Sequence, residues 1–372
     1  MDRKRLAGRS AAHPLNRWGA ACCLALLLGC VGLRGETGPK SLRLLSRTPL
    51  AQGSSPAMDI RWASDGSVYV ARARDGVLEL AVNGTRLRQA VPDIKTFGRF
   101  ERFERLAVSP RALVFASAGW YMAWRPRQAE PGGRVVFNRK GIGITEDIDL
   151  RGDRLLLLGI AEHGETFAPK GDVAWVGTLS SNLEDLKPVL YDDGGPGAPN
   201  FFKCRSHETG AVRFLSDGSF VIVPGFQKGV HLFAANGERA RSWTSEQLGL
   251  DTDCSTLTAE EETQLLRNPE AWQRWLNSHH VVDDILPLPQ GPGLLVRSLG
   301  RDGQAHWELK VLSRERVTTY SVPVAGRRPL DRLHGDVRNG RIVFLLSASG
   351  FSVSPDSADY TGEILLAAVP NP

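Results

Sequence analysis

The sequence has little that would place it among membrane-spanning or nucleic-acid-binding proteins. Its most apolar stretch, residues 18–29, has twelve residues, and as a helix it would span about 18 Å of a bilayer core roughly 30 Å thick. The formal charge of +5 is concentrated at the N-terminus, where residues 1–29 hold five bases and one acid. Residues 30–372 carry 41 bases against 40 acids, so net charge gives no argument for a nucleic-acid partner.

The motifs of several enzyme classes are also missing. The chain has no GxSxG nucleophile elbow, no HExxH zinc motif, no P-loop and no GxGxxG between a strand and a helix. Hydrophobic residues make up 42% and charged residues 23%, which excludes an intrinsically disordered chain. The sequence therefore indicates a folded protein that displays no known catalytic motif.

Residues 1–29 combine a basic stretch with a short apolar one. A basic stretch precedes the apolar residues 18–29, and Leu27-Leu28-Gly29-Cys30 resembles a lipobox. The resemblance implies a signal peptide cleaved after Gly29, palmitate and related lipid on Cys30, and a membrane anchor in the cell envelope. Val31, in place of Asp, implies an outer-membrane lipoprotein that faces the periplasm or the cell surface. An ordinary secretory signal is the alternative, and residues 30–56 are expected to form a tether.

Cysteine usage agrees with export. Of the five cysteines, Cys22 and Cys23 would leave with the signal peptide and Cys30 would be acylated. The remaining pair, Cys204 and Cys254, is expected to form a disulfide in an oxidising compartment. Such a bond, closing a loop of about 50 residues, would stabilise the fold by roughly 4 kcal/mol.

Past residue 56 the chain repeats a pattern of short strands and tight turns. In 58–82, apolar runs alternate with Asp-Gly and Asn-Gly turns, and residues 211–237 repeat this layout. The two units align without a gap from Arg61 and Arg213 through Val70 and Ile222. Weaker copies follow the same order of inner strand, turn and more apolar second strand, at 104–125, 147–179, 282–312 and 334–369.

Six copies over 57–372 average about 53 residues, a length typical of large propeller blades. One such unit cannot bury both faces of its sheet, whereas units stacked in a ring share their cores. The chain here resembles six-bladed β-propellers of the NHL/TolB-like kind, which implies an all-β monomer. A seven-bladed propeller or a pair of sandwiches is the alternative.

Two segments stand outside the repeats. The stretch from Ser41 to Leu45 is apolar enough to add an outer strand to the last blade, which ends near Val369. Residues 256–280 have a helical pattern, with a capping box at Thr258 and Glu261. We therefore expect a small helical insertion between blades 4 and 5.

Each predicted innermost strand carries charged residues. A ring of strands would bring these side chains to a common axis, where they would either compensate one another or bind a polar ligand through arginine donors. The candidate ligand-binding residues are Asp59, Arg61, Arg105, Asp147, Arg213, Asp283, His334 and Asp336.

The expected function is binding: a scaffold for a protein partner or a polar small molecule, with no cofactor. The alternative is an enzyme, because some six-bladed propellers are lactonase-like hydrolases with axial Ca²⁺ and others are sugar dehydrogenases with a His base. Asp59, Glu104, Asp147, Asp283 and Asp336 offer carboxylates for Ca²⁺. His163 and His207 fall in loops where a base would sit, but no catalytic residue is assigned.

Overall fold

The computed structural model describes most of the chain after residue 39. The described ranges are 40–51, 55–91, 103–117, 120–124, 133–136, 142–161, 171–179, 186–192, 210–224, 229–250, 278–328, 331–347 and 362–371, with seven single positions between 260 and 275. Residues 1–39, and with them the predicted leader and Cys30, lie outside these ranges. Cys204, Cys254, His163 and His207 also lie outside them.

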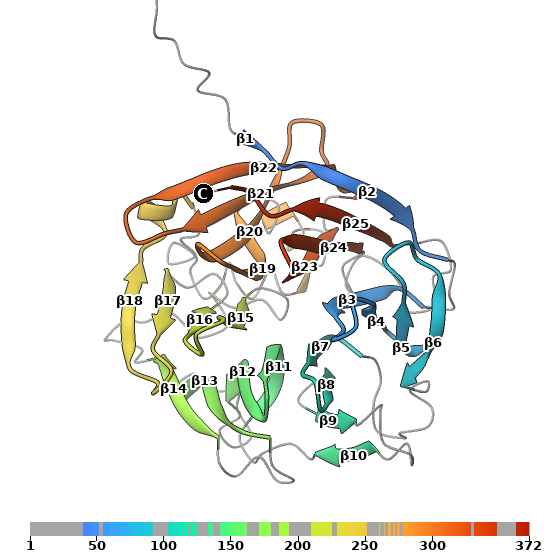
Figure 1. The fold of residues 1–372 in the computed structure, drawn as a ribbon. Coiled ribbons are helices and arrows are strands. Elements are labelled where there is room, and N and C mark those ends of the chain that lie inside the picture. The colour runs from blue at the N-terminus through green and yellow to red at the C-terminus, as the bar shows by residue number, and fades with distance from the viewer. Residues whose placement is uncertain are drawn as a thin grey trace, which may run out of the picture. The chain divides into compact units, whose positions relative to one another are not determined.

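The described strands form antiparallel sheets that follow one another along the chain, numbered here as blades (Figure 1). Blade 1 holds β3 (Ala57–Trp62), β4 (Val68–Arg72), β5 (Gly76–Leu80) and β6 (Arg86–Val91). Blade 2 holds β7 (Arg105–Val108), β8 (Leu113–Ser117), β9 (Trp120–Trp124) and β10 (Gly133–Val136). Blade 3 holds β11 (Ile142–Arg151), β12 (Arg154–Ala161), β13 (Gly171–Thr178) and β14 (Lys187–Asp192).

The second half of the chain continues the series. Blade 4 holds β15 (Ala211–Phe214), β16 (Phe220–Val223), β17 (Val230–Phe233) and β18 (Arg239–Trp243), followed by a 3-10 turn at Glu246–Leu248. Blade 5 holds β19 (Val281–Leu288), β20 (Gly291–Leu299), β21 (Ala305–Leu312) and β22 (Val317–Ala325). Blade 6 holds β23 (Arg332–Arg338), β24 (Arg341–Ser347) and β25 (Glu363–Ala368).

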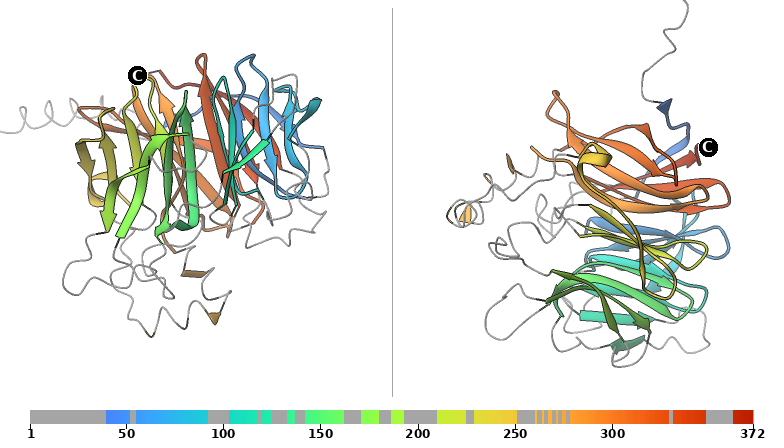
Figure 2. Two further views of the ribbon diagram at one scale, coloured as in Figure 1. Left: turned by 90° about the horizontal axis from the view of Figure 1, so that it is seen from below. Right: turned by 90° about the vertical axis from the view of Figure 1, so that its left-hand side faces the viewer.

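The blades close into a ring. Each innermost strand contacts the innermost strand of the next blade, from β3 through β7, β11, β15, β19 and β23 and back to β3 (Figure 1). A separate apolar core fills each junction between neighbouring blades, as the clusters of buried side chains show. Seen from the side, the strands run between two faces of the ring (Figure 2). The all-β propeller predicted from the repeats is confirmed.

The two units that align best in sequence also share a turn geometry. Between β3 and β4, the Asp65 carboxylate accepts hydrogen bonds from the backbone N–H and the hydroxyl of Ser67. Between β15 and β16, Asp217 makes the same pair of bonds to Ser219. Gly66 and Gly218 sit between them at φ of 91° and 89°, a conformation that glycine adopts at little cost. The Asp-Gly signal therefore marks the same turn in both blades.

The segment before blade 1 forms strands that pair with the last two blades. β2 (Leu44–Pro49) pairs antiparallel with β25 and becomes the outer strand of blade 6. The sequence placed this strand at 41–45, too early, because Lys40–Ser41 forms a separate strand, β1, which pairs in parallel with β22 of blade 5. The apolar residues of the predicted strand thus divide between two blades.

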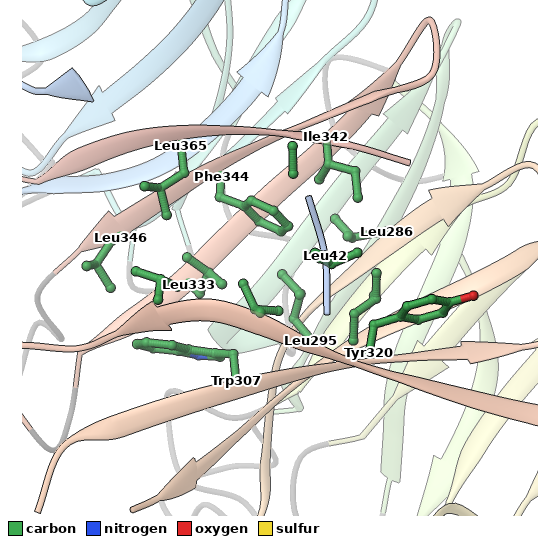
Figure 3. Packing of buried hydrophobic residues seen from close by; sticks show 14 of the residues in the cluster. Leu42, Leu286, Leu295, Trp307, Tyr320, Leu333, Ile342, Phe344, Leu346 and Leu365 are labelled. Atoms are coloured by element: carbon green, nitrogen blue, oxygen red, sulfur yellow. The ribbon is translucent and has the colours of Figure 1, made fainter. Parts of the chain in front are cut away.

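Leu42 lies between these two pairings. Its backbone N–H donates to the carbonyl of Ser321, and its side chain packs in the core shared by blades 5 and 6 (Figure 3). We call residues 40–50 the strap. Because it bonds to both blades before the chain enters blade 1, the strap joins the first and last parts of the propeller.

The predicted helical insertion is described at few positions. Glu260, Gln264, Arg267, Ala271, Arg274 and Trp275 have helical backbone, and the remaining positions of 256–277 other than Asn268 lie outside the described residues. Within the described ranges, no helix has the length and apolar character to cross a bilayer.

Candidate functional site

The charged residues predicted to line a channel lie on the innermost strands. Asp59 and Arg61 come from β3, Arg105 from β7, Asp147 from β11, Arg213 from β15, Asp283 from β19, and His334 and Asp336 from β23. All are buried except Asp336, which is half-buried. Such a concentration of buried charge requires that each group find partners.

The innermost strand of each blade has a free edge, whose backbone N–H and C=O groups need partners other than a sheet ladder. At every junction, a charged side chain of one blade bonds to that edge of the next blade. Carboxylates accept from backbone N–H groups, as in Asp59 to Leu106 (2.9 Å), Asp147 to Val212 (2.8 Å), Asp149 to Phe214 (2.7 Å), Asp284 to Gly335 (3.0 Å) and Asp336 to Trp62 (2.9 Å).

At the two remaining junctions, an arginine side chain bonds to the free edge of the next blade. Arg105 Nε donates to the carbonyl of Glu146 on β11 at 2.7 Å, and Arg213 Nε donates to the carbonyl of Ile285 on β19 at 3.0 Å. Together with the carboxylates, these side chains cross every junction between the described blades in one direction around the ring. We call these contacts the axial clamps.

The axial clamps meet at Asp284. Its carboxylate lies 2.5 Å from Arg213 Nη2, 3.5 Å from Arg61 Nη1 and 3.8 Å from His334 Nδ1. Arg213 also lies 3.6 Å from Asp149. Arginines from blades 1 and 4 therefore share one carboxylate from blade 5, which links strands on different sides of the axis.

The pKa values follow from this arrangement. Burial opposes ionisation of Asp284, but Arg213 and Arg61 outweigh it and hold the pKa of that carboxyl well below its usual range. Burial raises the pKa of Asp147 to about 6, and the charge of Asp284 adds to the effect, while Arg213, Arg105 and Arg61 offset part of it. Burial likewise raises the pKa of Asp336.

The raised pKa of Asp147 gives a test of the clamps. The folded protein binds this proton more tightly than the unfolded chain, whose Asp titrates near 3.8. Its contribution to stability is therefore complete below pH 3.8 and is lost as the pH rises through about 6. In Asp147→Asn the side-chain oxygen can still accept from Val212, but this titration disappears.

Urea denaturation of both proteins across this pH range measures the difference in their free energies of unfolding. As the pH rises, we expect the wild type to lose stability relative to the variant by up to about 1.4 kcal/mol per pH unit. The difference should level off above the pKa of Asp147 in the folded protein. A difference that does not change with pH would show that Asp147 is not buried among these charges.

Asp283, which the sequence grouped with the channel residues, has partners in both blade 5 and blade 6. Its carboxylate accepts from Arg297 Nε of β20 at 3.2 Å and from Trp307 Nε1 of β21 at 2.7 Å, and it also accepts from the backbone N–H of Leu333 on β23 at 3.3 Å. A register shift between Val282 and Asp284 interrupts the regular alternation of side chains at this point, and Asp284 is the aspartate that pairs with Arg61 and Arg213. The sequence cannot tell which of the two adjacent aspartates pairs with these arginines.

Three axial residues come close enough to one another to suggest a metal site. Carboxylate oxygens of Asp59 and Asp284 and a ring nitrogen of His334 lie within 4.8 Å of one another. However, Arg61 Nη1 is 2.5 Å from Asp59 Oδ1 and 3.5 Å from Asp284 Oδ2. The guanidinium supplies the cation between these carboxylates, so the set does not fit Ca²⁺, which requires six to eight oxygens at about 2.3–2.6 Å.

Comparison with known proteins supports the fold. No protein-family model matches the sequence, and no curated protein sequence matches it. The WD40 repeats of RRP9 superpose with a TM-score of 0.51 at 10% identity, covering 89% of this chain and 100% of that one. A DUF4221 family member from Bacteroides vulgatus gives 0.51 at 8% identity, covering 88% and 97%.

A third structure, the calcium-binding protein regucalcin from Agrobacterium tumefaciens, gives a TM-score of 0.47 at 11% identity and covers 90% of this chain and 96% of that one. At 10% and 8% identity, the likeness to the first two structures shows the propeller fold alone. A fold by itself assigns no function.

Proposed function

We propose that this chain is an exported, lipid-anchored, six-bladed propeller whose role is to bind a protein partner at its surface. The observation that carries the proposal is the axial clamps. Each charged residue that would recognise a ligand on the axis already bonds to the next blade or to an opposite charge. A ligand on the axis would have to replace bonds that hold the ring, whereas the outer surface is open to a partner.

The alternative, a lactonase-like hydrolase or a sugar dehydrogenase, gains less support from the axis. A hydrolase of that kind needs carboxylate oxygens directed at a metal, and here Asp59 and Asp284 are directed at Arg61. The lipid anchor rests on Leu27-Leu28-Gly29-Cys30, whose resemblance to a lipobox favours attachment at the membrane over release.

Photo-crosslinking in intact cells of a diderm bacterium tests both parts. We expect the wild-type chain to incorporate labelled palmitate and to crosslink to a discrete protein in a reproducible ratio. Cys30→Ser removes the lipid site and should abolish the label and release the chain from the membrane fraction, while Cys23→Ser, in the leader, serves as the matched control.

Two results would count against the proposal. Palmitate incorporation that persists in Cys30→Ser would overturn the anchor. A chain that crosslinks to no protein in cells, yet after purification hydrolyses lactones or oxidises sugars with added Ca²⁺ or quinone, would replace the binding role with the enzymatic alternative.

A further inference from the structure

A hollow lies between blades 4 and 5, on the face formed by the turns that join each first strand to the second and each third strand to the fourth. We call this the turn face. The hollow has a volume of about 680 Å³. Its apolar lining comes from both blades and includes Leu215, Leu232 and Trp243 of blade 4 with Leu288, Pro292 and Leu312 of blade 5.

A second hollow of about 330 Å³ lies on the other side of the Ser313–Arg316 turn. The two share Gln290, Ser313 and Arg314 in their linings. The two hollows therefore adjoin at the end of blade 5, and we call them together the groove; its lining runs from Trp243 in the first hollow to Tyr320 in the second. A groove of this form suits an extended chain better than a compact small molecule.

Arginines border the groove. Arg241 stacks over the Trp243 ring, with 4.6 Å from its guanidinium carbon to the ring centroid, and its Nη1 donates to the carbonyl of Arg314 at 2.8 Å. The side chains of Arg314 and Arg316 are exposed on the turn. In the part of the chain that the structure describes, no carboxylate oxygen lies within 4 Å of Arg241 or Arg314.

The acidic residues in the lining of the groove offset the positive charge of these arginines only in part. Asp217 is bonded to Ser219, and its pKa is lowered by these bonds and, to a smaller degree, by Arg151. Glu315 is the other acid in the lining. Elsewhere on the turn face, Arg154 and Arg338 donate to carbonyl oxygens of the next blade. Such partners leave the positive charge of an arginine uncompensated.

We propose that the groove binds an extended, acidic segment of a partner protein, with apolar side chains inserted between blades 4 and 5 and carboxylates paired with Arg241, Arg314 and Arg316. This inference rests on the proposed binding role and specifies its surface. Arginine beside an aromatic ring and an apolar floor is the composition in which binding energy concentrates at protein interfaces.

The probe for the test is a short fluorescein-labelled peptide of Glu, Ser and Leu, with a Lys-for-Glu peptide of the same pattern as its counterpart. The test variant is Arg314→Glu with Arg316→Glu. The turn that carries them is held by Ser313, whose N–H and hydroxyl donate to the carbonyl of Arg316, so it does not depend on either guanidinium. The matched control is Arg301→Glu, an exposed site at the opposite end of blade 5.

Fluorescence anisotropy should show that the wild-type protein binds the acidic peptide and not its basic counterpart, with affinity falling as salt rises. The double variant should bind at least about 10-fold more weakly, while Arg301→Glu should match the wild type. Equal binding by all three proteins would overturn the proposal. Binding of anionic phosphatidylglycerol vesicles without binding of the peptide would overturn it in favour of a lipid surface.

The photo-crosslinking experiment separates this inference from the proposed function. If the double variant retains the crosslinked partner in full, the groove is not the docking surface, although the binding role stands. If the wild-type chain crosslinks to no protein, the binding role itself fails.

Discussion

Replacing Asp284 with alanine should lower the free energy of unfolding by about 3–5 kcal/mol. The substitution leaves Arg213 and Arg61 buried without the carboxylate that they share, and it removes the acceptor for the N–H of Gly335. Removing one partner from a buried ion pair is costly because the remaining charge stays out of water. Urea or guanidinium denaturation, followed by tryptophan fluorescence, measures the change.

The matched control is Asp153→Ala. Asp153 pairs with Arg111 at 3.4 Å on the turn face, where both side chains are exposed, and exposed ion pairs contribute little to stability. We expect its denaturation midpoint to stay close to that of the wild type. If Asp284→Ala and Asp153→Ala have equal effects, Asp284 is not the centre of the axial clamps.

The second large loss of stability is expected from a substitution in the strap. Leu42 is 4% exposed in the core between blades 5 and 6, while Leu45, three residues on, is 42% exposed. Leu42→Ala should cost about 2–5 kcal/mol, because it removes buried methyl groups and leaves a cavity. Leu45→Ala changes the same residue type at the surface and should have almost no effect on the melting temperature.

Deletion of residues 40–50 extends this comparison. It removes Leu42, the buried Leu50 and the whole of β2, which exposes the edge of β25. The deletion should destabilise the propeller more than Leu42→Ala does, and calorimetry measures the drop in melting temperature. A deletion variant that melts with the wild type would show that the ring closes without the strap.

The repeat pattern predicts much of the fold, for a physical reason. Asp-Gly and Asn-Gly turns recur between short apolar runs, and the same turn residues make the same bonds at Asp65 and Asp217. A unit of this size has to share its core with neighbours. Turn chemistry is local, and it is therefore readable from one sequence.

Less of the candidate site can be predicted from the sequence. The sequence indicates that charged residues recur on the innermost strands, but it does not show that Asp284, beside a register shift in β19, pairs with Arg61 and Arg213 while Asp283 pairs with Arg297. It also gives no sign that Arg105 and Arg213 donate to backbone carbonyls of the next blade. These facts depend on how neighbouring blades meet, which no local pattern encodes. The sequence does not predict the groove between blades 4 and 5, for the same reason.

Hydrogen–deuterium exchange of the backbone amides of Leu106, Val212, Phe214, Gly335 and Trp62 tests the axial clamps most directly. These amides donate to aspartate side chains of the preceding blade. If the clamps hold the ring, these amides exchange only when the whole domain unfolds, as slowly as the central strands. Exchange within seconds under native conditions would contradict the account, because the axis would then be open to water.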